Sequence, residues 1–322
     1  MSFYDKFKIY RLEEEINSFD DERIFIKTGE EKNLLELSRK NPKIKKIYKQ
    51  LLANDYILYF HKDEISRFVK RTSLKYILDE NKYENYDEIF YTLQEPYGRK
   101  VNNKSEKKLL VIFSKMPGSK LYDSSKAPHR MLPAFFEDIE RSLVKNVYIM
   151  RIMDLNVSHG SHYVNTINFP NYEEKIQRAI NNIAEKLHIK EENIVLYGVS
   201  RGGVGSLLHG SYLDLKTLAV DPIVNIGGDM YANDRRILKD LRQDDLVPII
   251  NKNIDEKNRF PKFVICSENS KIYYNEIVRL NNEKFNILNM RDDNITTHPE
   301  VSQNTVPEQL MILNILLSSF NH

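Results

Sequence analysis

One short motif limits what this chain can fold into. Residues 196–203 read Leu-Tyr-Gly-Val-Ser-Arg-Gly-Gly and contain the pattern G-x-S-x-G, with Ser200 at its centre. The apolar run Ile194–Tyr197 leads into the motif, and a segment rich in small residues follows it. A serine in this pattern sits on a tight turn from a strand into a helix, where the two glycines avoid collisions with neighbouring backbone. The motif therefore predicts a strand, a strained turn at Ser200 and a helix.

Short apolar runs alternate with helical segments from about residue 108 onward. The predicted strands are 109–113, 147–153, 194–197, 218–220, 263–266 and 285–290, and the predicted helices include 132–143, a helix after Pro170, 273–280 and a last helix near Pro307. In the helix after Pro170, apolar residues recur at three- and four-residue spacing, and Asn171 is placed to cap its start. This alternation predicts parallel β-α-β units, and so a doubly wound, mostly parallel α/β sheet with helices on both faces.

Residues 1–105 differ in composition: they are rich in Lys, Glu, Asn and Tyr, and their apolar runs are short. Helices are expected over 34–37 and 44–52 and strands over 56–60 and 89–93, while 96–108 is typical of an exposed connection. We therefore expect an N-terminal α+β extension over residues 1–105 and an α/β catalytic domain over 106–322. Within that domain, 231–261 is a polar insertion that forms either a lid or a solvated helical excursion.

A serine nucleophile needs a base and an acid, which in this arrangement follow it in the order acid, then histidine. His298 comes just after the last predicted strand and is the expected base. Glu268 directly follows strand 263–266 and is the preferred acid, since the group that orients the histidine commonly sits there. Asp221, which follows strand 218–220, is the alternative.

An oxyanion hole needs two backbone donors. One is expected to be the amide of Arg201, the residue after the nucleophile. The other should come from the loop after strand 109–113, from Ser114 or Lys115, because Pro117 has no N–H to donate. Two interpretations of the Arg201 side chain stay open: it contacts an anionic substrate, or it is a surface arginine at a helix start.

Three further histidines follow or adjoin loops of the predicted sheet. His159 and His162 form H-x-x-H after strand 147–153, and His129 adjoins Pro128. Because no cysteine or carboxylate accompanies the H-x-x-H pair closely, a metal site is not expected. We expect all three histidines to line the substrate pocket.

Charge and cysteine content narrow the class of protein. The net charge is +2, from 48 Lys+Arg against 46 Asp+Glu, which lacks the basic excess of nucleic-acid-binding proteins. Cys266 is the single cysteine, so no intramolecular disulfide can form, and a reducing compartment fits. No apolar stretch reaches the length of a transmembrane helix. The expectation is a cytoplasmic protein, at most peripheral to the inner face of the membrane, without a nucleic-acid partner.

The elbow Tyr-Gly-Val-Ser-Arg-Gly-Gly, the Cys-Ser-Glu after a strand and the late Thr-His-Pro resemble capsular polysaccharide biosynthesis proteins of the XcbB/CpsF type. They also resemble the α/β-hydrolase part of the second accessory secretion protein of Gram-positive bacteria. The similarity covers roughly the last two thirds of the chain. It implies an α/β-hydrolase fold and transfer of acetyl groups to sugar hydroxyls, with Ser200, Glu268 and His298 as the triad.

Together these features predict a serine-dependent O-acyltransferase. Acetyl-CoA is the expected acyl donor, a sugar hydroxyl of capsular polysaccharide the acceptor, and capsule biosynthesis enzymes the partners. Two alternatives stay open. A carboxylesterase or deacetylase would use the same residues with water as the acceptor, and a hydrolase-fold scaffold in a capsule assembly complex would need no activated serine.

Overall fold

The larger of two sheets in the computed structural model, which describes residues 8–318, has eight strands. In chain order these are β5 (Glu84–Tyr86), β6 (Ile89–Gln94), β7 (Lys108–Phe113), β8 (Val147–Ile152), β9 (Ile194–Val199), β10 (Lys216–Val220), β11 (Lys262–Cys266) and β12 (Asn286–Asn289). Their order across the sheet is β12-β11-β10-β9-β7-β8-β6-β5. Strands β7 to β12 pair in parallel, and β6 and β5 add an antiparallel edge. The expected mostly parallel α/β sheet is confirmed.

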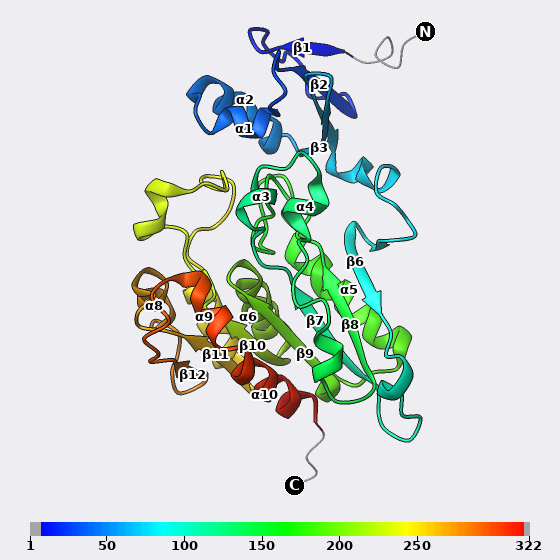
Figure 1. Cartoon of the computed structure of the whole chain (residues 1–322), viewed down its shortest axis with the longest axis vertical. Helices are drawn as coiled ribbons and strands as arrows, with labels where there is room; N and C mark the ends of the chain where they lie inside the picture. Colours follow the sequence, from blue (N-terminus) through cyan, green and yellow to red (C-terminus); the bar gives the residue numbers. More distant parts are fainter. Residues whose placement is uncertain (1–7, 319–322) are drawn as a thin grey trace.

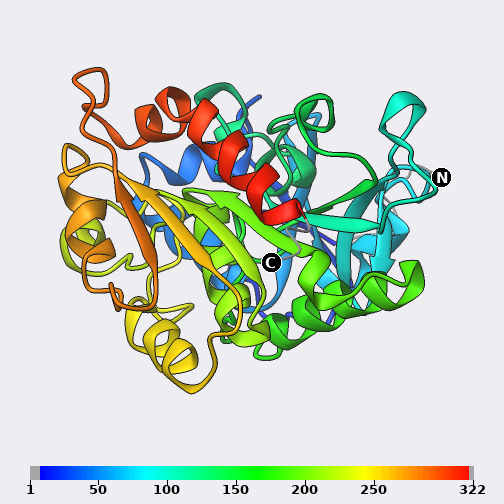
Figure 2. The same cartoon turned by 90° about the horizontal axis from the view of Figure 1, so that it is seen from below.

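Helices cover both faces of this sheet (Figure 2). The longer ones are α5 (Tyr172–Leu187), α6 (Arg201–Leu213), α7 (Val247–Glu256) and α10 (Val306–Leu317). Side chains of a strand point to opposite faces in turn. Accordingly, Ile194 and Leu196 of β9 join the core beneath α5, whereas Val195 and Tyr197 join the core beneath α10. The continuous apolar run in β9 is thus explained by burial on both sides.

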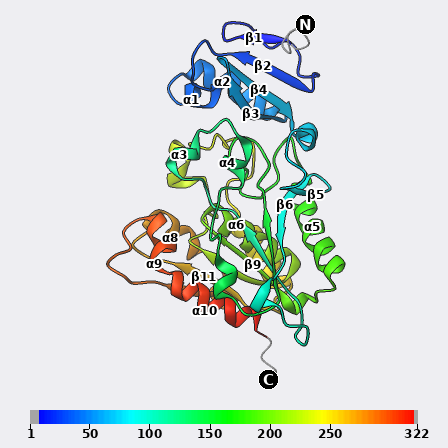
Figure 3. The ribbon, with the colours of Figure 1, turned by 45° about the vertical axis from the view of Figure 1, so that its right-hand side comes forward.

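A smaller sheet lies beyond one end of the large one, at the top of Figure 1 and Figure 3. Its order is β1-β2-β4-β3, with β1 and β2 parallel and the other pairs antiparallel. The strands are β1 (Ile9–Arg11), β2 (Arg23–Lys27), β3 (Tyr56–Lys62) and β4 (Ile65–Lys70), and α1 (Leu34–Ser38) and α2 (Pro42–Ala53) pack against them. Tyr48 of α2 and Val157 of the larger part belong to one buried cluster, so the two parts share a hydrophobic core.

The sheets divide the chain at a different point from the expected boundary near residue 105. Strand β6 pairs with β8, from Tyr91 opposite Ile152 to Gln94 opposite Ile149, and so belongs to the large sheet. The small sheet ends with β4 at Lys70. The residues of β6 predicted a strand, but only the pairing with a partner far along the chain assigns that strand to a sheet.

The helix expected over 132–143 is not formed. Only the 3₁₀ turn η4 (Ile139–Ser142) appears there. Pro133 disfavours the helical region for Leu132, which is the C-cap of α4 with ψ 56°, and Phe136 has a positive φ of 51°. The remaining short elements are α3 (Ser119–Tyr122), α4 (Ala127–Met131), α8 (Lys271–Ile277), α9 (His298–Asn304), η2 (Arg71–Tyr76), η3 (Gly98–Lys100), η5 (Glu191–Asn193) and η6 (Gly228–Asn233).

The start of α5 differs from expectation in one detail. The Asn171 side chain makes no capping hydrogen bond. Instead, Asn165 Oδ1, from the preceding loop, accepts a hydrogen bond from the Glu173 amide at 2.8 Å. Asn165 lies eight positions before the amide that it caps, and the local capping patterns cover only residues next to the helix start.

None of the helices within residues 8–318 combines the length and the apolar character needed to cross a bilayer.

Candidate active site

Ser200 lies on the sharp turn between β9 and α6, as the motif predicts. Its φ is 58° and its ψ is −116°, a conformation that non-glycine residues rarely adopt. A Cβ on Gly198 would lie 2.0 Å from the Gly202 carbonyl oxygen, and one on Gly202 would lie 2.0 Å from that of Phe113. Both positions therefore admit only glycine. Because Ser200 directly follows the parallel strand β9, it lies at the carboxyl end of the sheet.

That end of the sheet contains a topological switch point. From β7 the chain continues to β8 on one side and later returns to β9 on the other. Loops that follow β7 and β9 diverge there, which is where doubly wound sheets bind ligands. A cavity of about 280 Å³ opens at this point, lined by Lys115, Met116, Pro117, Gly118, Val199, Ser200, His298, Pro299, Ser302 and Gln303.

His298 is the first residue of α9, and its Nε2 lies 2.7 Å from Ser200 Oγ. The start of α9 is held by a capping box between Thr297 and Glu300. Hydrogen bonds from Thr296 and Thr297 favour the charged carboxylate of Glu300 and lower its pKa to about 2. The ring of Tyr273 packs on the imidazole with the two ring centres 4.0 Å apart. Backbone capping and ring packing thus both fix the histidine toward the serine.

The acid beside His298 is Asp221, which corrects the preference for Glu268. Asp221 Oδ2 lies 2.7 Å from His298 Nδ1 and also accepts a hydrogen bond from Ser270 Oγ at 3.1 Å. The Asp221 side chain is buried, with 1% exposed. The resulting line of hydrogen bonds runs from Asp221 through His298 to Ser200.

Glu268 is directed away from the imidazole. Its carboxylate accepts a hydrogen bond from Asn289 Nδ2 at 2.8 Å and pairs with Arg291 at 3.3 Å. The physical reason lies in the strand order. Asp221 directly follows β10, which pairs with β9, whereas Glu268 follows β11, one strand farther from Ser200. Asp221 followed by Pro222 at a strand end was the available sequence signal.

Of the two residues expected to complete the oxyanion hole, Ser114 is already engaged. Its amide donates to the Tyr163 hydroxyl at 2.6 Å. Lys115 lines the cavity with Ser200, and within residues 8–318 its amide has no hydrogen-bond acceptor. The backbone amide of Lys115 is therefore better placed than that of Ser114 to donate to an oxyanion. The Arg201 amide, at the start of α6, is the expected second donor. Tyr163, which occupies the Ser114 amide, carried no sequence signal.

Both interpretations of the Arg201 side chain are wrong, because it is fully buried. Its guanidinium donates to the carbonyl oxygens of Ser114 at 3.1 Å and Lys115 at 2.8 Å. Its other donors reach the carbonyls of Arg130, Met131 and His159. It therefore contacts neither solvent nor the cavity. It holds backbone carbonyls and pairs with the buried Asp154 at 3.8 Å.

The three other histidines do not line this cavity. His159 and His162 are fully buried, and burial holds the pKa of each well below its ordinary value. The loop that carries them folds around the buried Asp154. The Asp154 carboxylate accepts hydrogen bonds from the backbone amides of Ser161 and His162 at 3.1 and 2.9 Å. His129 is partly buried and bonds to Ser124 Oγ at 3.0 Å.

The insertion 231–261 also lies away from the cavity, which none of its residues line. Arg242 donates to the Ser161 carbonyl at 3.0 Å, and Arg236 lies 3.4 Å from His162 Nε2. The insertion thus packs on the loop that carries His159 and His162. Within residues 8–318, no cluster of His, Cys, Asp and Glu is arranged to hold a metal ion.

The sequence is similar to one known protein family and to one characterised relative. Residues 139–303, more than half of the chain, match the model of a family described as Accessory Sec system GspB-transporter. An accessory Sec system protein of Staphylococcus aureus is 35% identical over 83 residues, which are 26% of this chain. That match covers 15% of the relative, so the chain aligns with only a small part of that protein's length.

Several solved structures resemble the fold, among them the following two. The capsule O-acetyltransferase of Neisseria meningitidis serogroup A in complex with CoA has a TM-score of 0.50 and 15% identity, over 71% of this chain and 94% of that one. The Glycosylation Associate Protein (Gap123) complex of Streptococcus agalactiae also has a TM-score of 0.50, with 17% identity, over 79% of this chain and 50% of that one. At such identities the likeness concerns the fold, and it agrees with the sheet order and elbow of an α/β-hydrolase.

Proposed function

The chain belongs to the accessory Sec system GspB-transporter family, and on that premise we propose that it is a serine-dependent O-acyltransferase that places acetyl groups on sugar hydroxyls. One observation carries the proposal: the two hydrogen bonds of 2.7 Å that join Asp221, His298 and Ser200 beside a cavity. A serine hydroxyl is a weak nucleophile by itself, and a hydrogen-bonded base with its own orienting acid is the standard means of activating it.

The first half of the proposed reaction acylates Ser200. Its Oγ attacks the carbonyl carbon of an acetyl thioester while His298 Nε2 takes the hydroxyl proton. Asp221 stabilises the imidazolium that forms, and the amides of Arg201 and Lys115 hold the oxyanion. The carbon–sulfur bond then breaks, the leaving sulfur takes the proton from His298, and an acetyl ester remains on Ser200.

The second half transfers the acetyl group. A sugar hydroxyl gives its proton to His298 and attacks the acetyl ester, and Ser200 recovers the proton as the new sugar ester leaves. We propose acetyl-CoA as the donor and a capsular glycan as the acceptor. A cavity of about 280 Å³ can hold the acetyl end of the donor and an approaching hydroxyl. The N. meningitidis protein of the same fold, solved with CoA, supports this choice at the level of the fold.

The setting of the reaction is part of the proposal. The single cysteine, Cys266, is buried, and this suits a reducing, cytoplasmic compartment. The S. agalactiae structure is named as a complex of a glycosylation-associated protein. For this chain we propose capsule biosynthesis enzymes as partners.

The proposal is tested by intact-mass spectrometry after treatment with a fluorophosphonate probe. Wild type, Ser200→Ala and His298→Ala are compared. We expect one adduct on wild type, none on Ser200→Ala, and slow labelling of His298→Ala. Folded wild-type protein that stays unlabelled would contradict an activated serine and favour a scaffold.

Wild-type protein that has not been exposed to the probe is separately incubated with acetyl-CoA in the presence and absence of capsular oligosaccharides. Loss of the acetyl mass from Ser200 that depends on the oligosaccharide, with the same mass gained by the sugar, is the expected result. Equal loss in buffer alone would identify an esterase that uses water instead.

A further inference from the structure

Arg201 connects three separate stretches of backbone around the cavity. Its side chain is fully buried and donates to carbonyls after β7, at the end of α4 and in the loop after β8. Two of these carbonyls, of Ser114 and Lys115, belong to consecutive residues of the loop that faces Ser200. The buried Arg201 side chain thus holds the loop at Ser114 and Lys115, which lies across the cavity from the nucleophile.

The direction of the two carbonyls determines where the loop amides point. In a trans peptide unit the C=O of one residue and the N–H of the next are antiparallel, and the described residues contain no cis peptide bond. A Ser114 carbonyl that faces the Arg201 guanidinium therefore directs the Lys115 N–H away from it. A Lys115 carbonyl on the same guanidinium directs the Met116 N–H away likewise. Lys115 and Met116 both line the cavity that contains Ser200.

We propose that Arg201 is a positioning residue: its side chain aims the Lys115 amide, with the Met116 amide beside it, at the oxyanion on Ser200 that the Arg201 amide also holds. This inference rests on the proposed serine chemistry and names the side chain that organises it. The role suits arginine, whose planar guanidinium has five N–H donors in a fixed fork. Lysine offers three donors on one rotating nitrogen and cannot hold two consecutive carbonyls in the same geometry.

The chain contains a matched control in Arg130. It is also fully buried, and it donates to the carbonyls of Ser158 and Leu58 at 2.8 Å. A third donor reaches the carbonyl of Ser124. None of these carbonyls belongs to the loop at Ser200. Arg130→Lys therefore reproduces the loss of a buried guanidinium without releasing the Lys115 and Met116 amides.

The test compares wild type, Arg201→Lys and Arg130→Lys in hydrolysis of p-nitrophenyl acetate. Active sites are counted by exhaustive fluorophosphonate labelling, so that rates refer to folded molecules. For Arg201→Lys we expect kcat to fall on the order of 10²-fold, the cost of losing one oxyanion donor, with KM nearly unchanged. Arg130→Lys should keep the wild-type kcat per active site. If Arg201→Lys does not fold, Arg201→Gln is measured in its place.

The outcomes separate this inference from the proposed function. Equal kcat in Arg201→Lys and Arg130→Lys would overturn the positioning role while leaving the activated serine intact. A fall in Arg201→Lys confined to KM would overturn it too, because oxyanion contacts act on the transition state. Absence of labelling in folded wild type would overturn both.

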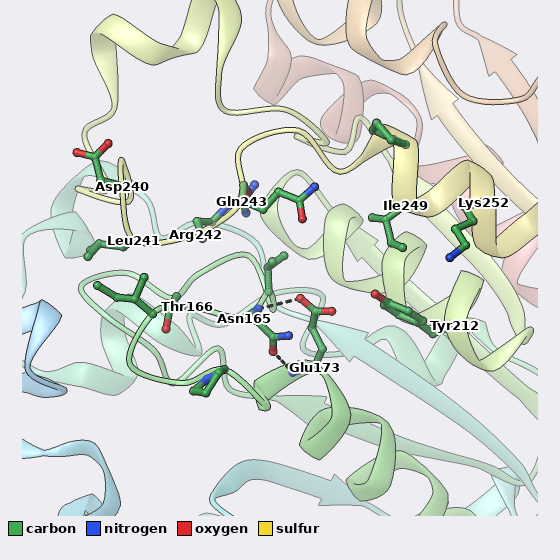
Figure 4. Close-up of a pocket in the computed structure, with 14 residues that line it drawn as sticks. Asn165, Thr166, Glu173, Tyr212, Asp240, Leu241, Arg242, Gln243, Ile249 and Lys252 are labelled. Atoms are coloured by element: carbon green, nitrogen blue, oxygen red, sulfur yellow. Dashed lines mark hydrogen bonds between the residues drawn. The ribbon is translucent and has the colours of Figure 1, made fainter.

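A second, independent observation concerns the cavity between α5, α6, α7 and residues 240–243, which has a volume of about 740 Å³ and does not include Ser200 (Figure 4). Glu173 and Asn165 form one wall, locked by reciprocal hydrogen bonds of 2.9 and 2.8 Å between backbone and side chains. Gln243 and Ile249 face them, and Tyr212 lies at the side. The polar groups are therefore held in place before any ligand arrives.

The chemistry of these walls describes a neutral ligand with hydroxyl groups. Three of the four charged lining residues already have partners. Asp240 pairs with Lys49, Lys252 pairs with Glu256, and Arg242 donates to the carbonyl oxygens of Ser161 and Gln243. Burial raises the pKa of the Glu173 carboxyl, which makes its charged form less favourable. Carboxylate, amide and ammonium groups offer both acceptors and donors, which hydroxyls match because each can donate and accept. Tyr212, 38% exposed, adds an aromatic face for the apolar side of a ring.

We infer that this cavity is a glycan-binding site separate from the catalytic one, and the preference for a glycan over a peptide rests on the proposed sugar acceptor. Binding is measured by calorimetry with neutral trisaccharides of glucose, galactose and N-acetylglucosamine, on Ser200→Ala protein so that no turnover intervenes. Tyr212→Ala should weaken binding at least tenfold, and Tyr76→Ala, which alters an exposed tyrosine outside the cavity, should not.

Two results would overturn the glycan site: no trisaccharide binds, or Tyr212→Ala binds as tightly as its control. Binding of penta-alanine in place of the sugars would identify a polypeptide as the occupant. Because Ser200 is absent from the protein used, a failure here says nothing against the activated serine, and a failure of fluorophosphonate labelling says nothing against this cavity.

Discussion

At the scale of single residues, the triad acid determines how well the protonated form of His298 is stabilised during the reaction. Asp221 is buried and lies 2.7 Å from His298 Nδ1, whereas Glu268 is paired with Arg291. Asp221→Asn preserves the shape of the side chain and removes the charge that stabilises the imidazolium. We expect fluorophosphonate labelling to slow on the order of 10⁴-fold, as in other serine triads, with little change in Tm.

Glu268→Gln serves as the control for that measurement. It removes the same charge from a carboxylate that follows the neighbouring strand, and its labelling rate should stay within about threefold of wild type because surface ion pairs contribute little. A larger effect of Glu268→Gln than of Asp221→Asn would contradict the observed geometry.

At the scale of elements, the site depends on how closely α6 approaches β7. A Cβ at Gly202 would lie 2.0 Å from the Phe113 carbonyl oxygen, which belongs to a central strand and cannot move aside. Gly202→Ala must therefore push the helix from the sheet and displace Ser200. We expect the free energy of unfolding to fall by about 3 kcal/mol, the upper part of the range for overpacking, and labelling to be lost.

Gly118→Ala is the matched stability control in thermal denaturation. Nothing lies within 4 Å of a Cβ at this position, and its φ of −66° suits alanine. Its Tm should equal or slightly exceed that of wild type, since alanine restricts the unfolded chain. Equal Tm values for the two variants would mean that α6 and β7 lie farther apart than described.

At the scale of the whole molecule, buried neutral histidines link stability to pH. Burial lowers the pKa of His159 and His162 well below 6.5 and that of His209 to about 4. Since these pKa values are lower in the folded state, the unfolded state binds more protons below about pH 6.5. Stability is therefore complete above pH 6.5 and is lost as the pH falls toward the folded pKa values.

For His209 the expected loss between pH 6.5 and its folded pKa of about 4 is about 1.4 kcal/mol per pH unit, and His159 and His162 add to it in the same direction. The free energy of unfolding in urea is measured for wild type and His209→Asn at several pH values. Its slope against pH should be smaller in His209→Asn by the contribution of one histidine. His188→Asn is the control, because His188 is exposed and its left-handed conformation tolerates asparagine. An identical slope for wild type and His209→Asn would contradict a neutral buried imidazole.

Local pattern was sufficient for much of this protein. Apolar runs marked β7, β9, β10, β11 and β12, the G-x-S-x-G spacing marked the turn at Ser200, and chain order marked His298. These features are carried by neighbouring residues, because a strand period, a tight turn and a helix start each depend on a few consecutive positions. The fold class and two members of the triad follow from them.

Tertiary packing alone decided the rest. The choice of Asp221 over Glu268 depends on which strand lies beside β9, and β6 joins the large sheet only through its pairing with β8. Arg201 and His162 have polar side chains that propensity assigns to a surface or a pocket, yet both are fully buried because distant carbonyls and arginines gather around them. Such contacts join residues far apart in the chain, and no local pattern encodes which of them meet.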